Sequence, residues 1–163
     1  MTPELIRRKS PAHFPPLSRR GKPVVIFITV CVMRSSTPLT SSEIFLILVE
    51  TWKTIKDWHV GYFVLMPDHL HFLCSPNRDG FASLNTWIRA WKRIASRMAT
   101  KNGKKIFWQK NYWDTQIRNG HHLFDRLKYM EQNPVRENLC DTYQDWPYRG
   151  KIFDIPNYLD FSL

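Results

Sequence analysis

Apolar residues recur along the chain with two periods, and each period predicts one kind of element. Val24–Met33, with the sequence VVIFITVCVM, is β-branched and aromatic, which predicts a strand buried on at least one face. Val60–Leu65 and His69–Cys74 predict two further strands, separated by a bend at a Pro-Asp pair. Ile106–Ile117 predicts a fourth strand.

Three other segments have apolar residues at helical spacing. Ile44–Trp58 follows Thr40–Glu43, whose hydroxyl residues are typical of a helix N-terminus. Ala82–Thr100 is expected to be a long helix that an Asn-Gly pair stops. Its apolar face would carry Trp87, Trp91, Ile94 and Met98. Leu123–Asn133 predicts a third helix, which Pro134 is expected to end.

The resulting order of elements is β-α-β-β-α-β-α. It predicts an α+β fold of the ferredoxin-like split βαβ type, an antiparallel sheet with helices on one face and an added C-terminal helix. Residues 1–22 form a basic, Pro-rich N-terminal arm, and residues 23–139 form the domain. The aromatic and Pro-containing tail, residues 140–163, is expected to pack back on the domain.

The amino-acid composition indicates which class of partner the protein would bind. The 163 residues fit one domain, and a hydrophobic fraction of 43% excludes wholesale disorder. Lys and Arg number 24 against 14 Asp and Glu, so the net charge of +10 favours a polyanion, with nucleic acid first and an anionic membrane surface second. Seven tryptophans beside this charge suit single-stranded nucleic acid, although a basic pI alone is also common in proteins with other roles.

The cysteines and the apolar runs indicate a cytoplasmic protein. Cys31, Cys74 and Cys140 are far apart and odd in number, so neither a disulfide framework nor a cysteine zinc site is expected. No segment reaches the ~20 apolar residues of a membrane helix. The basic residues near the N-terminus are not followed by the apolar run of a secretory signal.

A histidine pair is the most informative local pattern. Side chains alternate faces along a strand, so His69 and His71 share one face while the apolar residues beside them face the core. Two adjacent imidazoles predict a divalent-metal site. Two alternatives remain at this point: solvent-facing histidines on a half-buried strand, or a structural zinc site to which His121 or His122 adds a ligand.

The third predicted helix carries a tyrosine away from its apolar face. That face would consist of Leu123, Phe124, Leu127 and Met130. Asn133 follows Tyr129 by one turn, so both side chains can face one point in space. This arrangement suits a nucleophile beside a metal ion, and the alternative is a tyrosine half-buried at the edge of the domain.

Basic residues gather on the second predicted helix. Arg89, Arg93 and Arg97 are spaced by four residues and would form one stripe. Further positive charge comes from Lys92, Lys101, Lys104 and Lys105, and from Arg136 beyond the tyrosine. These residues are predicted to contact DNA, against the alternative of an ordinary solvated helix face.

Four segments together resemble a known family. They are Tyr62–His71 (YFVLMPDHLH), Thr86–Arg93 (TWIRAWKR), Phe107–Asp114 (FWQKNYWD) and Tyr129–Arg136 (YMEQNPVR). In order and spacing they resemble the single-tyrosine HUH transposases of the insertion-sequence-200-like superfamily, and within it the REP-associated tyrosine transposases. The resemblance covers nearly the whole chain, and Tyr129 lies 58 positions after His71.

The resemblance implies a role for each site residue. His69 and His71 correspond to the HUH metal ligands, and Tyr129 stands at the position of the nucleophile. Asn133 stands where the wider superfamily has a glutamine as third ligand, and Gln132 is a possible substitute. The implied cofactor is Mg²⁺ or Mn²⁺, and the ferredoxin-like fold is also that of the family.

The resemblance also implies a reaction and a partner. The expected reaction is metal-dependent transesterification of single-stranded DNA, with a 5′-phosphotyrosine intermediate and a free 3′-hydroxyl. The expected substrate forms a hairpin, and the protein would be a monomer or homodimer at the nucleoid. The alternatives are a catalytically inactive or domesticated single-stranded nucleic-acid-binding module of the same fold, and an RNA-binding ferredoxin-like domain.

Overall fold

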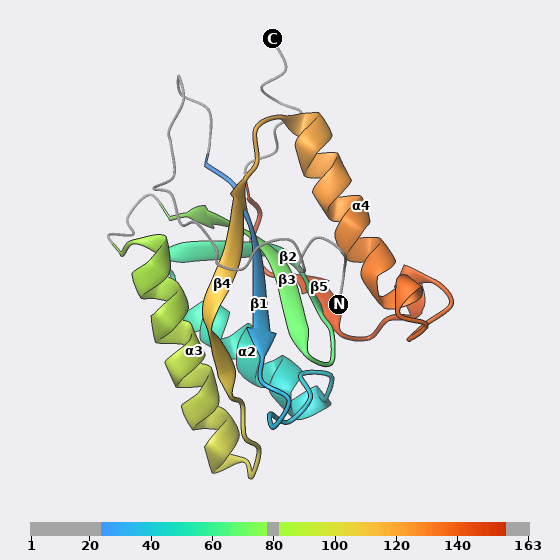
Figure 1. Cartoon of the computed structure of the whole chain (residues 1–163). Coiled ribbons are helices and arrows are strands. Elements are labelled where there is room, and N and C mark those ends of the chain that lie inside the picture. Colours follow the sequence, from blue (N-terminus) through green and yellow to red (C-terminus); the bar gives the residue numbers. More distant parts are fainter. Residues whose placement is uncertain (1–23, 78–81, 156–163) are drawn as a thin grey trace.

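The computed structural model describes residues 24–77 and 82–155 (Figure 1). The predicted N-terminal arm and the last residues of the predicted tail lie outside this part of the chain. The elements are β1 (Ile26–Val32), α2 (Ser42–Thr54), β2 (Trp58–Leu65), β3 (His69–Pro76), α3 (Leu84–Lys101), β4 (Trp108–Gln116), α4 (Gly120–Arg136), a 3₁₀ turn η1 (Tyr143–Asp145) and β5 (Arg149–Lys151).

The strands form one sheet in the order β4-β1-β3-β2-β5, and neighbouring strands are antiparallel. α2 connects β1 to β2, and α3 connects β3 to β4, which is the split βαβ arrangement. The predicted ferredoxin-like α+β fold is therefore confirmed. None of the helices in the described segments has both the length and the apolar character needed to cross a membrane.

The sheet face that α2 and α3 cover carries the larger core. Side chains of Ile28 on β1 and of Leu70 and Phe72 on β3 point to this face and are fully buried. All seven tryptophans lie in the described residues: Trp52, Trp58, Trp87, Trp91 and Trp146 are buried, and Trp108 and Trp113 are half-buried. The five buried rings belong to the two apolar clusters and cannot stack on bases.

α4 covers the opposite face of the sheet and packs on a second apolar cluster. Leu123 and Met130 of α4 contact this cluster, which includes Phe27 of β1. Trp146, from the tail, is also buried here, and its Nε1–H donates to the carbonyl oxygen of Leu65 at 2.9 Å. Phe124, which was expected on the apolar face of the helix, is instead 61% exposed.

α4 does not end at Pro134, so that prediction is wrong. The helix continues to Arg136, and Asn133 lies inside its last turn. Proline lacks one donor, but the backbone N–H groups of Glu137 and Leu139 donate to the carbonyls of Asn133 and Pro134. Asn138, with φ of 56°, then turns the chain away.

The boundaries of α2 and α3 are set by local caps. Ser41 precedes α2 and its side chain accepts a hydrogen bond from the N–H of Ile44. α2 stops at Thr54, and Trp58, which was predicted as its last residue, begins β2. α3 ends at an Asn-Gly pair as predicted, because Gly103 adopts φ of 70°.

β5 was not predicted as a strand, and it extends the sheet beyond β2. It pairs Gly150 with Phe63 and Arg149 with Val64. A Cβ atom added at Gly150 would lie 2.9 Å from the ring of Phe63, which is buried. The close approach of β5 to β2 therefore requires glycine at this position.

Replacing Gly150 with alanine should destabilise the protein. The added methyl group meets a core ring that cannot move freely, so we expect a loss of about 1–3 kcal/mol in the free energy of unfolding. Urea unfolding measures the change. Lys151→Ala, at the next and exposed position of β5, is the matched control and should leave the midpoint where it is; equal loss in both variants would contradict this packing.

Candidate active site

His69 and His71 lie at the middle of the sheet, on the face that α4 covers. On one side of β3 lie β1 and then β4, and on the other side lies β2. The register between β1 and β3 places His71 opposite Thr29 and His69 opposite Cys31. Relative exposure is 5% for His69 and 1% for His71, so these are not solvent-facing histidines. Their shared face is the one that strand alternation predicted.

Asn133 of α4 reaches both imidazoles. Its Nδ2 atom lies 2.7 Å from Nε2 of His71 and 3.3 Å from Nε2 of His69. The Asn133 side chain is 2% exposed, so this contact is shielded from water. Three side chains from two separate elements thus meet at one buried point.

Hydrogen bonds on the far side of each ring fix the imidazoles. Nδ1 of His69 lies 2.7 Å from Oδ1 of Asp68, and a carboxylate can accept but not donate. Nδ1 of His71 lies 2.7 Å from Oγ1 of Thr29. The hydrogen of His69 therefore lies on Nδ1, while the Thr29 hydroxyl can pair with either tautomer of His71. Both Nε2 atoms face the Asn133 amide.

The protonation of these groups follows from their surroundings. Burial holds the pKa of His71 well below its usual value, and the neighbouring His69 and Arg126 act in the same direction. The hydrogen bond with His69 lowers the pKa of the Asp68 carboxyl. His71 is thus neutral at neutral pH, which is the form that binds a metal ion.

The residues fit a divalent cation. Oδ1 of Asn133 is buried and has no hydrogen-bond partner among the described residues, an arrangement that costs free energy. Turning the amide would bring Oδ1, in place of Nδ2, toward the two Nε2 atoms, and the three atoms could then bind one cation. Two imidazoles and an amide oxygen are ligands that Mn²⁺ accepts.

The structural-zinc alternative finds no support in the described residues. They contain no group of three His, Cys, Asp or Glu side chains placed to hold a metal. His121 and His122 lie in the first turn of α4, roughly 17 Å along the helix from Asn133. His121 is exposed beside Asp125, and His122 accepts a hydrogen bond from the N–H of Arg118.

Tyr129 lies beside the histidine pair. Its half-buried ring packs edge-on against His71 at 5.3 Å between centroids and against Phe27 at 6.2 Å. The guanidinium of Arg136 lies 6.0 Å from the same ring and donates to Oε1 of Gln132 at 3.1 Å. Gln132 therefore contacts Arg136, while Asn133 is the amide that contacts the histidines.

Tyr112 and Tyr143 lie away from the histidine pair. Tyr112 of β4 is buried in the core that α2 and α3 cover, on the opposite face of the sheet from His71. Tyr143 follows α4 and packs on the guanidinium of Arg149 at 4.7 Å. Among these three tyrosines, Tyr129 is the one whose ring contacts a histidine of the pair.

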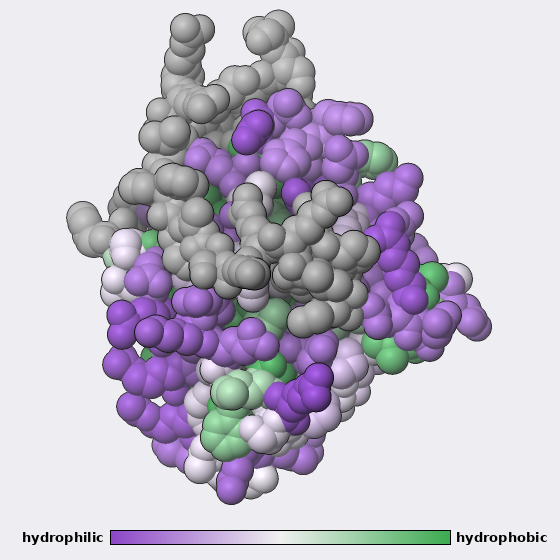
Figure 2. All heavy atoms as spheres, viewed as in Figure 1, coloured by the Kyte–Doolittle hydropathy of each residue, from purple (hydrophilic) through white to green (hydrophobic). Residues whose placement is uncertain are grey.

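The basic residues of α3 lie on the other side of the sheet from the histidines. Arg89, Arg93 and Arg97 are exposed, as are Lys101 and Lys105, and Lys104 is half-buried. Figure 2 shows hydrophilic side chains over much of the surface around this helix. The structure thus places the predicted DNA-contacting residues of α3 apart from Tyr129, and Arg136 next to it.

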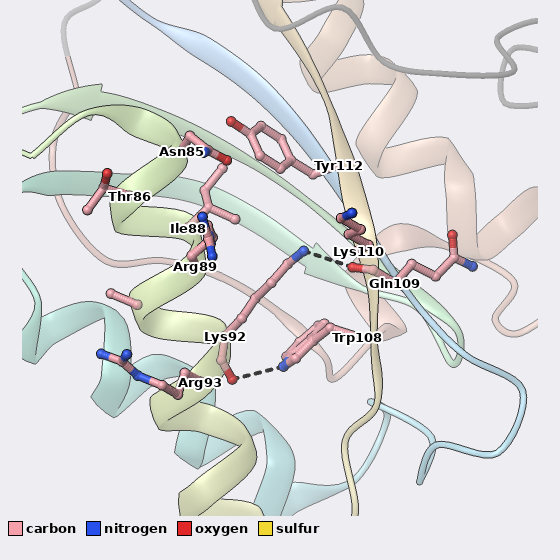
Figure 3. A pocket seen from close by; sticks show the side chains of 11 residues that line it. Asn85, Thr86, Ile88, Arg89, Lys92, Arg93, Trp108, Gln109, Lys110 and Tyr112 are labelled. Atoms are coloured by element: carbon pink, nitrogen blue, oxygen red, sulfur yellow. Dashed lines mark hydrogen bonds between the residues drawn. The ribbon is translucent and has the colours of Figure 1, made fainter.

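A groove of about 550 Å³ separates α3 from the edge strand β4. Arg89 and Arg93 line one wall and Lys110, which the sequence reasoning missed, lines the other (Figure 3). Lys92 differs from the expected solvated charge: it is buried, and its Nζ donates to the carbonyl of Gln109 at 3.1 Å. Burial lowers the pKa of Lys92 to about 8.

The buried state of His71 predicts how stability depends on pH. Its folded pKa lies below its unfolded pKa, so the unfolded chain binds more protons as the pH falls. The stabilisation is therefore complete above about pH 6.5 and is lost below it, at up to about 1.4 kcal/mol per pH unit.

Urea unfolding between pH 5 and 7.5, in the presence of a chelator, measures this slope. His71→Gln cannot titrate, so its free energy of unfolding should change less steeply with pH than that of the unsubstituted protein. Identical slopes for the two proteins would show that His71 is not buried in its neutral form.

Comparisons with known proteins agree with this fold. No family model matches the chain. A protein of Haemophilus influenzae named as a REP-associated tyrosine transposase is 31% identical over 101 residues, which are 56% of this chain and 57% of that protein. The match thus spans little more than half the length of the relative.

Solved structures give the second comparison. The structure of a REP-associated tyrosine transposase bound to a REP hairpin superposes with a TM-score of 0.65 at 20% identity, covering 87% of this chain and 96% of that one. A Deinococcus radiodurans structure named as a putative transposase reaches a TM-score of 0.47 at 15% identity, covering 71% of this chain and 96% of that one. This chain therefore has the fold of a REP-associated tyrosine transposase, and a sequence relative of that name confirms the resemblance that its motifs indicated.

Proposed function

We propose that this chain is a transposase that nicks and joins single-stranded DNA, with Tyr129 as its nucleophile. His69, His71 and Asn133 would hold Mg²⁺ or Mn²⁺ beside it. The observation that carries the proposal is the convergence of both Nε2 atoms on Asn133, with the ring of Tyr129 packed on His71 at 5.3 Å. Resemblance to REP-associated tyrosine transposases in sequence and fold supports it.

The cation and the residues around it would have separate roles. A divalent cation, when bound, supplies positive charge that offsets the charge growing on the phosphate oxygens. Asp68 holds His69 in the tautomer that leaves Nε2 free to bind, and Thr29 fixes the orientation of the His71 ring. Burial keeps His71 in its neutral form, so protons compete weakly for that ligand near neutral pH.

Tyr129 would attack the scissile phosphate. A bond forms between its phenolic oxygen and phosphorus, and the bond from phosphorus to the 3′ oxygen breaks. The phenolic proton passes to water, and the leaving 3′ oxygen takes up a proton from water. The products are a 5′-phosphotyrosine and a free 3′-hydroxyl, which can attack the phosphotyrosine to rejoin the strand. Arg136, 6.0 Å from the Tyr129 ring, would bind the phosphate and hold it against the nucleophile.

The proposed substrate is single-stranded DNA that carries a hairpin. The solved relative is bound to a REP hairpin, and the net charge of +10 of this chain suits a polyanion. Arg89, Arg93 and Lys110 line the groove between α3 and β4 and would contact phosphates away from the cleavage site. Each such contact releases counterions, so DNA affinity should fall steeply with salt concentration.

An RNA-binding domain of ferredoxin-like fold is disfavoured by the position of α4. Such domains stack bases on aromatic side chains of an open sheet face. Here α4 packs over that face through Leu123 and Met130, and Phe27 stacks on His71 at 5.3 Å. The face is therefore occupied by the proposed metal site and its supporting side chains.

Tyr129→Phe tests the proposal and separates an enzyme from an inactive binding module. The change removes the phenolic oxygen and keeps the ring packing on His71, so the free energy of unfolding should fall by no more than about 1.5 kcal/mol. Covalent adducts with hairpin-bearing oligonucleotides in Mn²⁺ should drop at least about a thousand-fold on a denaturing gel. DNA affinity, which comes from Arg and Lys, should remain.

Tyr148→Phe is the matched control for this experiment. Tyr148 is also half-buried, and it packs between the two apolar clusters away from the histidine pair. Its variant should form the adduct at the rate of the unsubstituted protein. An adduct formed by Tyr129→Phe at that same rate would identify another nucleophile, and a protein that binds the oligonucleotides without any adduct would be the inactive module.

A further inference from the structure

A second cavity, of about 400 Å³, lies on the α4 side of the sheet at its β5 edge. It is bounded by α4, by β2 and β5, and by the η1 turn. Its principal lining residues are Tyr62, Met130, Glu131, Tyr143, Arg149 and Lys151. None of these side chains takes part in the histidine site.

Two cation–aromatic pairs form its polar walls. The guanidinium of Arg149 lies 4.7 Å from the ring centre of Tyr143, and Nζ of Lys151 lies 5.5 Å from that of Tyr62. The ring of Tyr62 is 42% exposed, and the Lys151 ammonium lies over it. A nucleobase would stack on this ring in place of the flexible Lys151 side chain, whose charge would then be free to meet the DNA backbone.

Arg149 has a donor without a partner. One of its terminal nitrogens donates to the carbonyl of Gln144 at 3.0 Å. Its Nε–H is buried and has no hydrogen-bond partner in the described part of the chain. A buried, unsatisfied donor of this kind costs free energy that an incoming acceptor would recover.

The opposite wall provides an acceptor and an apolar surface. Glu131 of α4 is exposed and brings a carboxylate to the cavity, while Met130 is buried beside it. A guanidinium donor, a carboxylate acceptor, an aromatic plane and an apolar floor together match the edge and the face of a nucleobase. A free phosphate would not use the stacking surface or the carboxylate.

The cavity lies on the other flank of α4 from the proposed nucleophile. At about 100° per residue, Asn133 is offset by about 40° from Tyr129 around the helix, whereas Met130 and Glu131 are offset by about 100° and 200°. A strand whose phosphate lies at Tyr129 must therefore cross α4 for one of its bases to reach the cavity.

We infer that this cavity binds one unstacked base of the single-stranded DNA substrate, on the other flank of α4 from the phosphate that Tyr129 attacks. The inference rests on the proposed function for the identity of its ligand. Stacking on Tyr62 supplies affinity, and the groups of Arg149 and Glu131 engage the edge of the base. The cavity thus selects where along the strand the phosphate meets Tyr129.

An abasic-site scan tests the inference. The probe is a hairpin oligonucleotide that the unsubstituted protein cleaves, with one base at a time removed from its single-stranded flank. Binding is measured with Tyr129→Phe, which prevents cleavage. One abasic position should weaken binding about 5- to 100-fold, as expected for one base stacked on an aromatic ring.

Adding Tyr62→Ala to the Tyr129→Phe protein tests whether the base found in this scan lies in the cavity. The exposed ring can be removed without opening the core, and thermal unfolding checks this. The intact probe should then bind as weakly as the abasic one, and removing that base should cost nothing further. Glu131→Gln, also at an exposed position, should change which base at that position binds best. Lys53→Ala, an exposed change on α2, is the matched control and should keep the full abasic effect.

The possible failures are distinguishable. If Tyr62→Ala and the abasic position weaken binding additively, or no abasic position matters, the base-binding cavity is wrong while adduct formation by Tyr129 still supports the proposed function. If no hairpin oligonucleotide is cleaved or bound by the unsubstituted protein, the proposed function fails and the inference fails with it.

Discussion

The contact between the Asn133 amide and two imidazole nitrogens is the constraint on which the rest of the structure depends. It is buried, and buried polar groups destabilise a fold unless their partners are placed with hydrogen-bond geometry. The β1–β3 register supplies Thr29 to His71, and the bend before β3 supplies Asp68 to His69. α4 must then cross the sheet at the position where Asn133 meets both rings.

Apolar packing holds α4 in that position from both sides of the contact. Leu123 and Met130 anchor the helix on the second apolar cluster, and Trp146 brings the tail under the same cluster. The tail continues into β5, which can approach β2 because Gly150 leaves room for Phe63. The helix that carries Tyr129 is thus fixed by the sheet below it and by the tail behind it, which suits a site whose groups must be preorganised.

Periodicity in the sequence was sufficient for the order of elements, for the shared face of His69 and His71, and for the one-turn spacing of Tyr129 and Asn133. The features that the sequence did not predict depend on contacts between distant parts of the chain. Pro134 lies in the last turn of α4, where it removes only the hydrogen bond that its own N–H would make to the carbonyl of Met130, and the helix continues to Arg136. Composition could not separate tryptophans that pack in a core from tryptophans that stack on bases. β5 is too short and polar to show a pattern, and the burial of Lys92 depends on a β4 carbonyl that lies across a groove.

Binding of Mn²⁺ by the purified protein tests the central claim, that two histidines and Asn133 form a divalent-metal site, most directly. Electron paramagnetic resonance reports the loss of the free Mn²⁺ signal as the ion binds. The unsubstituted protein and Gln132→Leu should bind one ion per chain, because Gln132 contacts Arg136 and not the histidines. Asn133→Leu and His69→Ala should lose that site. Equal Mn²⁺ affinity in Asn133→Leu and the unsubstituted protein, or no binding by either, would contradict the account.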